Sequence, residues 1–154
     1  MGNPNFAISS LESILQSRHH ISAVISNPPK PMGRKKILKH TEVGSYAIKN
    51  NIELIELNSF DDDVVELFIK YNKYDLIAYG SIVTHYKWMK WLTNTIKKYH
   101  PKTIAVVGNS VGGSCYDVFM NNCKADVVVI GEGELSTLDV LNAAKDKTSF
   151  EKIR

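Results

Sequence analysis

Two glycine-rich segments near the end of the chain have the residue types that can hold a ligand at the edge of a sheet. Residues 108–113 and 131–134 directly follow the apolar runs 103–107 and 126–130. Continuous Val/Ile runs without polar alternation are typical of parallel strands that helices cover on both faces. Ligands of such sheets bind outside the carboxyl ends of the strands, where glycine lets the backbone come close. The sequence therefore predicts a binding site at these two segments.

Residues that could act as nucleophiles or metal ligands give no such pattern. The two cysteines, Cys115 and Cys123, lie eight residues apart with no Cys-x-x-Cys pair, and we interpret them as free thiols on one helix. We predict no catalytic residue and no metal ligand in this chain. The chain has no signal peptide and no apolar run long enough to span a membrane, so we expect a cytoplasmic protein without a membrane partner.

Composition indicates a globular protein. A length of 154 residues with 44% hydrophobic content suits a single α/β domain over residues 1–154. The formal charge of +3 comes largely from a local basic segment at residues 30–39. Since a nucleic-acid surface usually has a broader basic face with interleaved aromatic residues, we do not expect a nucleic-acid partner.

The stretches on either side of the glycine segments alternate between strand and helix patterns. We predict strands near 21–26, 52–57, 75–79, 103–107 and 126–130, helices near 4–17, 41–50, 64–72, 86–99, 116–122 and 135–144, and a proline-rich loop at 27–34. Regular βα alternation without hairpin signals predicts a three-layer sandwich with a mostly parallel, doubly wound sheet of the Rossmann or flavodoxin type. Trp88 and Trp91 are expected to pack against this sheet.

The opening residues indicate that the first strand is missing. A doubly wound domain normally starts with a strand that ends in a turn such as Met1-Gly-Asn-Pro, and here nothing precedes that turn. We therefore expect an open strand edge that favours association. Adding an upstream strand should raise the melting temperature and suppress aggregation.

The first half of the chain resembles the amino-terminal part of methionyl-tRNA formyltransferases. The resemblance rests on Met1-Gly-Asn-Pro-Asn-Phe and on the Pro-x-x-Pro-x-Gly-Arg loop at residues 28–34, and it covers about residues 1–78. The working Asn and His of that family precede a Ser-Leu-Leu-Pro segment, which this chain lacks. His85 and His100 lie in other contexts, so the resemblance implies a fold without formyl transfer.

The second half, about residues 50–145, resembles the cobalamin-binding domain found ahead of the catalytic barrel in many radical S-adenosylmethionine enzymes. Three segments carry this resemblance, namely Tyr74–Thr84, Ala105–Ser114 and Ala125–Glu134, the last ending in Gly-Glu-Gly-Glu. It implies that cobalamin is bound at three strand ends, by Ser81 and Thr84, by Gly108 and Ser110, and by Gly131, Glu132 and Gly133. The hydroxyls of Ser81 and Ser110 would donate to the nucleotide arm. Glu132 would accept from backbone amides of the next helix or contact a partner barrel.

Two sequence motifs of cobalamin and radical enzymes are absent. The chain has no Asp-x-His-x-x-Gly loop and no Cys-x-x-x-Cys-x-x-Cys, so cobalamin would bind without a histidine ligand from this chain. We therefore predict a cobalamin-binding module that is not active as an isolated chain, and the resemblance allows it to be a fragment of a B12-dependent radical enzyme. Its partners would be a corrinoid and a radical S-adenosylmethionine domain in cis or in trans. The alternatives are a formyltransferase-like fragment and a truncated product whose sheet binds no ligand.

Overall fold

The computed structural model describes residues 4–57, 61–80, 83–108, 110–131 and 133–152. The chain divides into two compact units, with the boundary between Val65 and Glu66. We call them the amino-terminal unit and the carboxyl-terminal unit and describe each by itself. The α/β fold class with parallel sheets is confirmed.

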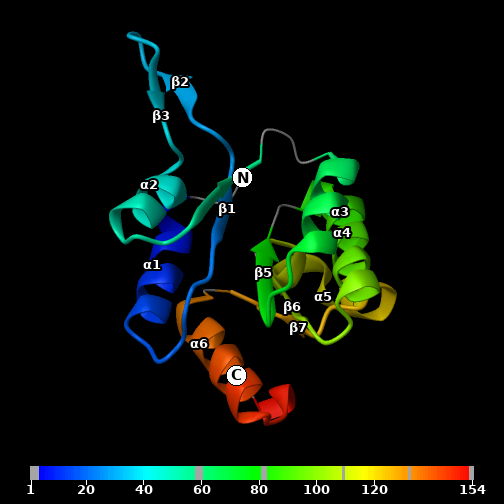
Figure 1. Ribbon diagram of the computed structural model, residues 1–154. Helices are drawn as coiled ribbons and strands as arrows, with labels where there is room; N and C mark the ends of the chain where they lie inside the picture. The colour runs from blue at the N-terminus through cyan, green and yellow to red at the C-terminus, as the bar shows by residue number, and fades with distance from the viewer. Residues whose placement is uncertain (1–3, 58–60, 81–82, 109, 132, 153–154) are drawn as a thin grey trace. The chain divides into compact units, whose positions relative to one another are not determined.

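The amino-terminal unit is a small α/β layer built on two parallel strands (Figure 1). Strands β1 (Val24–Ser26) and β4 (Leu54–Glu56) pair in register, and the helices α1 (Pro4–Leu15) and α2 (Glu42–Lys49) complete the layer. Helix α2 begins as predicted, because the Thr41 side chain accepts a hydrogen bond from the Gly44 amide at 3.0 Å and so caps the helix. A buried cluster of Val24, Ala47 and Ile52 forms the core of this unit.

The predicted loop at residues 27–34 is wrong, because part of it belongs to an antiparallel hairpin. Strand β2 (Lys30–Met32) pairs with β3 (Ile37–Lys39), and Pro31 lies opposite Leu38. Proline fits an isolated pair of strands where its nitrogen faces away from the partner strand, since only a donor on the outer side is lost. Gly33, with φ of 71°, provides the turn. The hairpin does not include the strands predicted at 21–26 and 52–57, which pair parallel with each other.

The carboxyl-terminal unit contains a sheet of three parallel strands in the order β5-β6-β7. These are β5 (Leu76–Gly80), β6 (Ile104–Gly108) and β7 (Val127–Val128), joined through α4 (Tyr86–Tyr99) and α5 (Ser110–Asn122). Three short or terminal elements complete the unit, namely the short helix η1 (Val83–His85), the helix α6 (Gly133–Asp146) and the turn η2 (Phe150–Lys152). Helix α3 (Asp62–Tyr71) crosses the boundary between the units, and its first turn carries Asp62 and Asp63 as the helix dipole favours.

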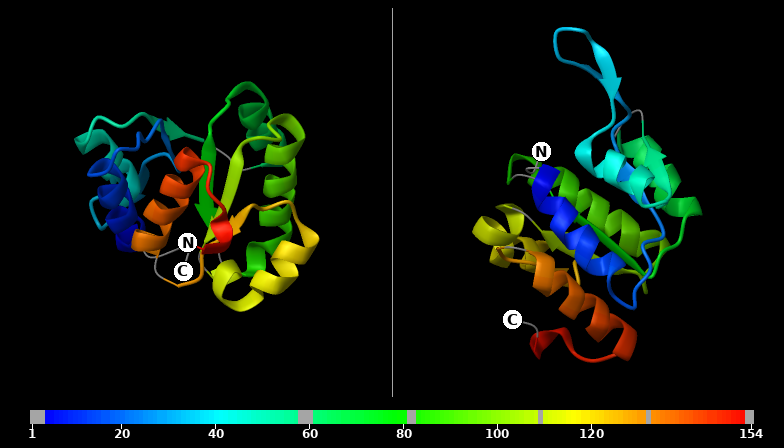
Figure 2. Two further views of the ribbon diagram at one scale, coloured as in Figure 1. Left: turned by 90° about the horizontal axis from the view of Figure 1, so that it is seen from below. Right: turned by 90° about the vertical axis from the view of Figure 1, so that its left-hand side faces the viewer.

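Helices cover both faces of this sheet, so the predicted three-layer arrangement holds in this unit (Figure 2). On one face, Val107 packs with Met89 of α4 and Phe119 of α5. On the other face, Val106 packs with Val129 and with Val140 of α6. Trp88 lies against the first cluster, as expected for a packing residue.

Element boundaries show where sequence patterns were informative. Helix α4 has the predicted bounds, whereas α5 starts six residues before the predicted 116 and β7 holds only two residues of the predicted 126–130. Within the described ranges, no helix is both long enough and apolar enough to cross a membrane. The prediction of one domain over residues 1–154 stays a prediction.

An ion pair between α4 and the start of β7 fixes the amino-terminal ends of β6 and β7. The Asp126 carboxylate accepts from the Ala105 amide at 2.7 Å and from Lys97 Nζ at 2.6 Å, while Lys97 Nζ also donates to the Thr103 carbonyl at 2.6 Å. The Lys97 side chain is only 11% exposed, so these partners replace much of the water that would otherwise surround its ammonium group.

We expect Asp126→Ala to lower the free energy of unfolding by about 1–3 kcal/mol, since it removes the carboxylate partner of the Lys97 ammonium and leaves the Ala105 amide without its acceptor. Urea denaturation measures the change. The matched control is Asp139→Ala at an exposed site on α6, which should shift stability by less than about 0.5 kcal/mol. Equal effects of the two variants would contradict this role for Asp126.

Glu66 on α3 links this helix to the end of α4. Its carboxylate accepts from Lys98 Nζ at 2.8 Å and from the Tyr99 hydroxyl at 2.7 Å. These two hydrogen bonds, Lys98 first, hold the pKa of Glu66 below its ordinary value of 4.5.

The lowered pKa predicts a small acid sensitivity of the fold. The unfolded chain takes up the Glu66 proton first, so the contribution of this carboxylate is complete above its ordinary pKa of 4.5 and is lost as the pH falls through the folded-state pKa. We expect Glu66→Gln to reduce the slope of unfolding free energy against pH in that acidic range. The change should be small, because surface pairs are screened by water. An unchanged slope would contradict the link.

Candidate functional site

The carboxyl ends of the parallel strands in the carboxyl-terminal unit form one edge, from which helices begin. Gly80 at the end of β5 lies in register with Gly108 at the end of β6. After these ends the chain enters η1 at Val83 and α5 at Ser110, and after β7 it enters α6 at Gly133. Because backbone amides at a helix start point outward and carry partial positive charge, this edge suits a ligand with phosphate or amide oxygens.

The predicted site residues map onto this edge as far as the structure describes them. Thr84 is exposed in η1, Gly108 ends β6, Gly131 is exposed after β7, and Gly133 opens α6. Ser81 and Glu132 lie outside the described residues. Ser110 is the first residue of α5, but its side chain is also outside them. The ligand-binding roles of all seven stay predictions.

Gly108 and Gly131 are glycine for different reasons. Gly131 has φ of 83°, a left-handed conformation that other residues adopt with strain. Gly108 has no such φ, and a Cβ atom built there meets no described atom within 4 Å. Among the described residues, therefore, neither the backbone conformation nor the packing requires glycine at position 108.

The sequence-based prediction missed Gly80, which the register places beside Gly108. A signal was present, because Gly80 follows the apolar run Leu76–Tyr79 as Gly108 follows Ile104–Val107. It also missed two apolar side chains that flank the third glycine segment. Ile130 is 55% exposed and Leu135 is 77% exposed, so the edge has an apolar rim as well as polar backbone groups.

His100 and Cys123 lie at the other end of the strands, before β6 and before β7. His100 Nε2 lies 2.7 Å from the Ile69 carbonyl, a contact between the end of α4 and α3. Burial raises the pKa of the half-buried Cys123 thiol, which opposes its ionisation to a nucleophile. Among the residues that the structure describes, no three His, Cys, Asp or Glu side chains gather closely enough to hold a metal ion.

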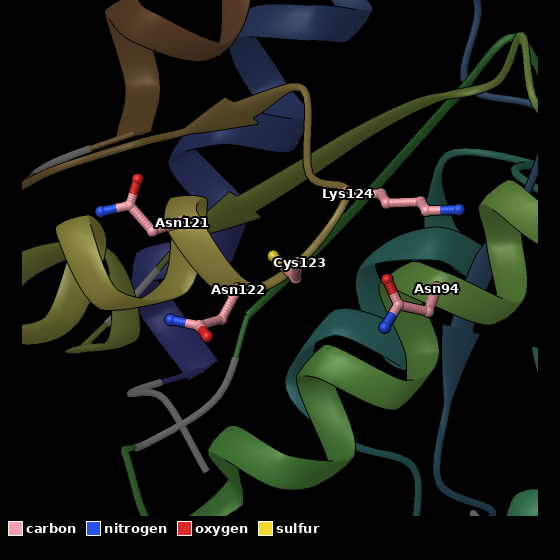
Figure 3. Close-up of a pocket in the computed structure, with 5 residues that line it drawn as sticks. All are labelled: Asn94, Asn121, Asn122, Cys123 and Lys124. Atoms are coloured by element: carbon pink, nitrogen blue, oxygen red, sulfur yellow. The ribbon is translucent and has the colours of Figure 1, made fainter.

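A shallow cavity of about 620 Å³ lies at the opposite end of α5 from the glycine edge. Its lining residues are Asn94, Asn121, Asn122, Cys123 and Lys124. Figure 3 shows Asn94 projecting from α4 toward the segment that carries Lys124, while Asn121 and Asn122 point in different directions. The amide of Asn122 already donates to the Val118 carbonyl at 2.7 Å. Since Lys124 precedes β7, this cavity is separate from the glycine edge.

Comparison with known proteins gives two likenesses. The family model described as "B12 binding domain" matches residues 30–141. Among curated proteins, the methionyl-tRNA formyltransferase of Acetivibrio thermocellus is 38% identical over 86 residues, which are 54% of this chain and 28% of that protein. The methionyl-tRNA formyltransferase of Sulfurihydrogenibium sp. is 28% identical over an alignment of 170 positions, which covers 99% of this chain and 54% of that protein.

Both resemblances predicted from the sequence are confirmed by these matches. The family match begins earlier than the predicted residue 50, because it takes in the hairpin and α2. The chain spans about half of the Sulfurihydrogenibium relative and about a quarter of the Acetivibrio relative.

Proposed function

The chain belongs to the B12-binding domain family, and from that premise we propose that it is a module that holds a corrinoid at the carboxyl edge of strands β5, β6 and β7. The residues proposed to frame the ligand are Ser81, Thr84, Gly108, Ser110, Gly131, Glu132 and Gly133. When bound, the corrinoid would supply the cobalt-centred chemistry, and this chain would supply position and shape.

The position and surroundings of Gly108 are the main support for this proposal. This glycine lies at the end of the central strand β6, and a Cβ atom at this position would meet no described atom within 4 Å. A large flat ligand benefits from a strand end without a side chain, because the backbone can then approach its face. Because neither the backbone conformation nor the described packing requires glycine at position 108, we attribute the glycine to the close approach of a ligand.

The helix starts around Gly108 supply the polar part of the proposed site. Helices α5 and α6 are 13 and 14 residues long, and both begin at the edge where the strands end. Their first amides lack partners within the helix and favour anionic oxygen atoms. Those amides suit the phosphate and amide arms of a corrinoid, while the exposed Ile130 and Leu135 suit its apolar periphery.

We further propose that no side chain of this chain ligates the cobalt, since the sequence lacks the Asp-x-His-x-x-Gly loop. The module would then work with a radical S-adenosylmethionine domain, in cis or in trans, and would not be catalytic alone. We place it in the cytoplasm, as the sequence predicts. These finer statements rest on the resemblance described from the sequence.

Spectroscopic titration of the purified chain with hydroxocobalamin tests the module. We expect saturable binding with one corrinoid per chain and a change in the corrinoid absorption spectrum. Unsaturable or absent binding would overturn the proposal. Mixing the purified chain with a candidate radical S-adenosylmethionine domain is a separate experiment. It tests whether the two proteins associate, independently of corrinoid binding.

A formyltransferase-like role is the second candidate, since this chain resembles proteins named methionyl-tRNA formyltransferase over up to 99% of its length. The residues that such a reaction needs, a base and a polarising group beside the reacting amine, have no counterpart in the segment after β5. We therefore expect no formyl transfer from 10-formyltetrahydrofolate to methionyl-tRNA by the purified chain. Measurable transfer would favour the second candidate.

A further inference from the structure

The hairpin of β2 and β3 carries exposed apolar side chains on both of its faces. Every residue from 30 to 39 is exposed, and none belongs to the buried cluster of the amino-terminal unit. Figure 1 shows the hairpin projecting away from α1 and α2 of this unit. Because side chains alternate along a strand, the register puts Met32 and Ile37 on one face and Leu38 on the other. These three side chains are 56%, 55% and 66% exposed. A folded surface that packs against such a ribbon covers one face, whereas a medium that surrounds the ribbon covers both.

The same hairpin is strongly basic. Five of the ten residues 30–39 are Lys or Arg, and residues 13–41 contain no Asp or Glu. Lys30 lies directly opposite Lys39, an unfavourable pairing of like charges. The other three cations, Arg34–Lys36, are consecutive in the turn, where the Lys36 amide donates to the Gly33 carbonyl at 3.1 Å. Among the residues that the structure describes, none of the five cations forms an ion pair. Their charges therefore favour an anionic partner.

We propose that this hairpin binds the surface of an anionic lipid membrane, with its apolar side chains in the interface and its cations among the headgroups. Clusters of about four to eight Lys or Arg residues beside an apolar anchor are typical of proteins that bind anionic lipids. The paired part of the ribbon is three residues long, or roughly 10 Å. This length matches the depth of roughly 5–10 Å that interfacial segments reach.

A nucleic acid is the main alternative among anionic partners. Residues 7–45 contain no Phe, Tyr or Trp, whereas single-stranded nucleic acids bind by stacking their bases on aromatic side chains. A folded RNA would cover one face of the ribbon and leave Leu38, or Met32 and Ile37, in water. A membrane interface accommodates both faces, so the two exposed apolar faces favour lipid.

The proposed contact is peripheral. The expectation from the sequence that the chain has no membrane partner concerned segments that span the bilayer, and a surface contact needs none. The hairpin belongs to the amino-terminal unit, whereas the proposed corrinoid site uses strands of the carboxyl-terminal unit. The two proposals can therefore fail independently.

Co-sedimentation of the purified chain with lipid vesicles tests the proposal. We expect saturable binding to vesicles of phosphatidylserine and phosphatidylcholine in equal parts. Binding to phosphatidylcholine alone should be at least about tenfold weaker, because the neutral surface does not attract the cations. Raising the salt to about 1 M should also weaken binding to the anionic vesicles, because salt screens the charges.

Two triple variants test the charges of the turn. The first replaces its three cations: Arg34→Gln, Lys35→Gln and Lys36→Gln. The matched control replaces three exposed lysines of the carboxyl-terminal unit: Lys87→Gln, Lys124→Gln and Lys147→Gln. A Lys or Arg near an anionic membrane strengthens binding about fivefold, so the first variant should bind at least about 30-fold more weakly. The control should bind within about threefold of the unchanged chain. Both should keep the melting curve of the unchanged chain, since no buried residue is altered.

A double variant tests the apolar side chains at constant charge. Met32→Thr together with Leu38→Thr removes one apolar side chain from each face, and threonine retains strand propensity. We expect it to bind anionic vesicles at least about tenfold more weakly. Val118→Ser together with Met120→Ser is the control, since these side chains on α5 are 55% and 40% exposed. It should bind as the unchanged chain does.

Four outcomes would overturn the proposal. The first is no binding to the anionic vesicles. The second is equal binding by the two triple variants, because the charges of the turn would then not matter. The third is unchanged binding by the variant of Met32 and Leu38, which would show adsorption by charge without contact to the lipid interior. The fourth is tighter binding to bulk transfer RNA than to vesicles of equal phosphate content, lost in the turn variant, which would identify a nucleic acid as the partner.

Discussion

Gly108→Trp is expected to abolish corrinoid binding without unfolding the protein. A tryptophan side chain would occupy the space in front of β6, where a Cβ atom meets no described neighbour within 4 Å. We expect the dissociation constant for hydroxocobalamin to rise at least about 100-fold, which corresponds to roughly 2.7 kcal/mol. The free energy of unfolding should change by less than about 1 kcal/mol, since a Cβ atom at this position meets no described neighbour within 4 Å.

Two further variants separate a blocked site from a general effect of a large residue. Gly108→Ala adds only a methyl group and should weaken binding less than Gly108→Trp. Val118→Trp adds the same indole at a position on α5 that is 55% exposed, and it should bind hydroxocobalamin as the unchanged chain does. Binding by Gly108→Trp equal to that of Val118→Trp would show that the corrinoid site at this edge is wrong.

Phe119→Ala is expected to produce the largest loss of stability. Phe119 on α5 is fully buried, packs with Met89 and Val107, and meets the ring of Tyr86 edge-on with centroids 5.6 Å apart. Removing the ring leaves a cavity beneath α5, and such changes in a buried core cost about 3–5 kcal/mol. The midpoint of urea denaturation should fall accordingly.

Val118→Ala is the matched control, since it shortens the neighbouring side chain, which is exposed. Its effect should stay within about 0.5 kcal/mol. If Phe119→Ala does not fold, Phe119→Leu should give a measurable, smaller loss. A change below about 1 kcal/mol in Phe119→Ala would mean that the cluster of Met89, Val107 and Phe119 does not anchor α5 to the sheet.

Local patterns predicted the elements whose formation depends on nearby residues. Helix α4 has the predicted bounds because its apolar residues recur at helical spacing over 14 residues. The acidic start of α3 and the Thr41 cap of α2 were also readable, since both act within one helical turn. The paired strands β5 and β6 were found because an apolar run ends in glycine in each.

Elements that depend on distant partners needed the tertiary structure. The extent of β7 follows from its register with β6, in which Val127 and Val128 are the paired residues. The hairpin of β2 and β3 depends on Pro31 lying opposite Leu38, which residue types alone did not indicate. Helix α5 begins six residues before its predicted start. Its first turns contain glycines, and because glycine has low helix propensity, the residue pattern did not indicate a helix there.

The glycines of the candidate site show the same division. The sequence determined that glycine follows the apolar runs, and the resemblance it carries to B12-binding domains is confirmed by the family match. Only the tertiary structure decided that Gly80 and Gly108 lie side by side, because register is a property of two strands that 23 residues of chain separate. It also decided that Gly131 serves a left-handed turn while Gly108 faces open space, since φ and free volume depend on how the chain packs.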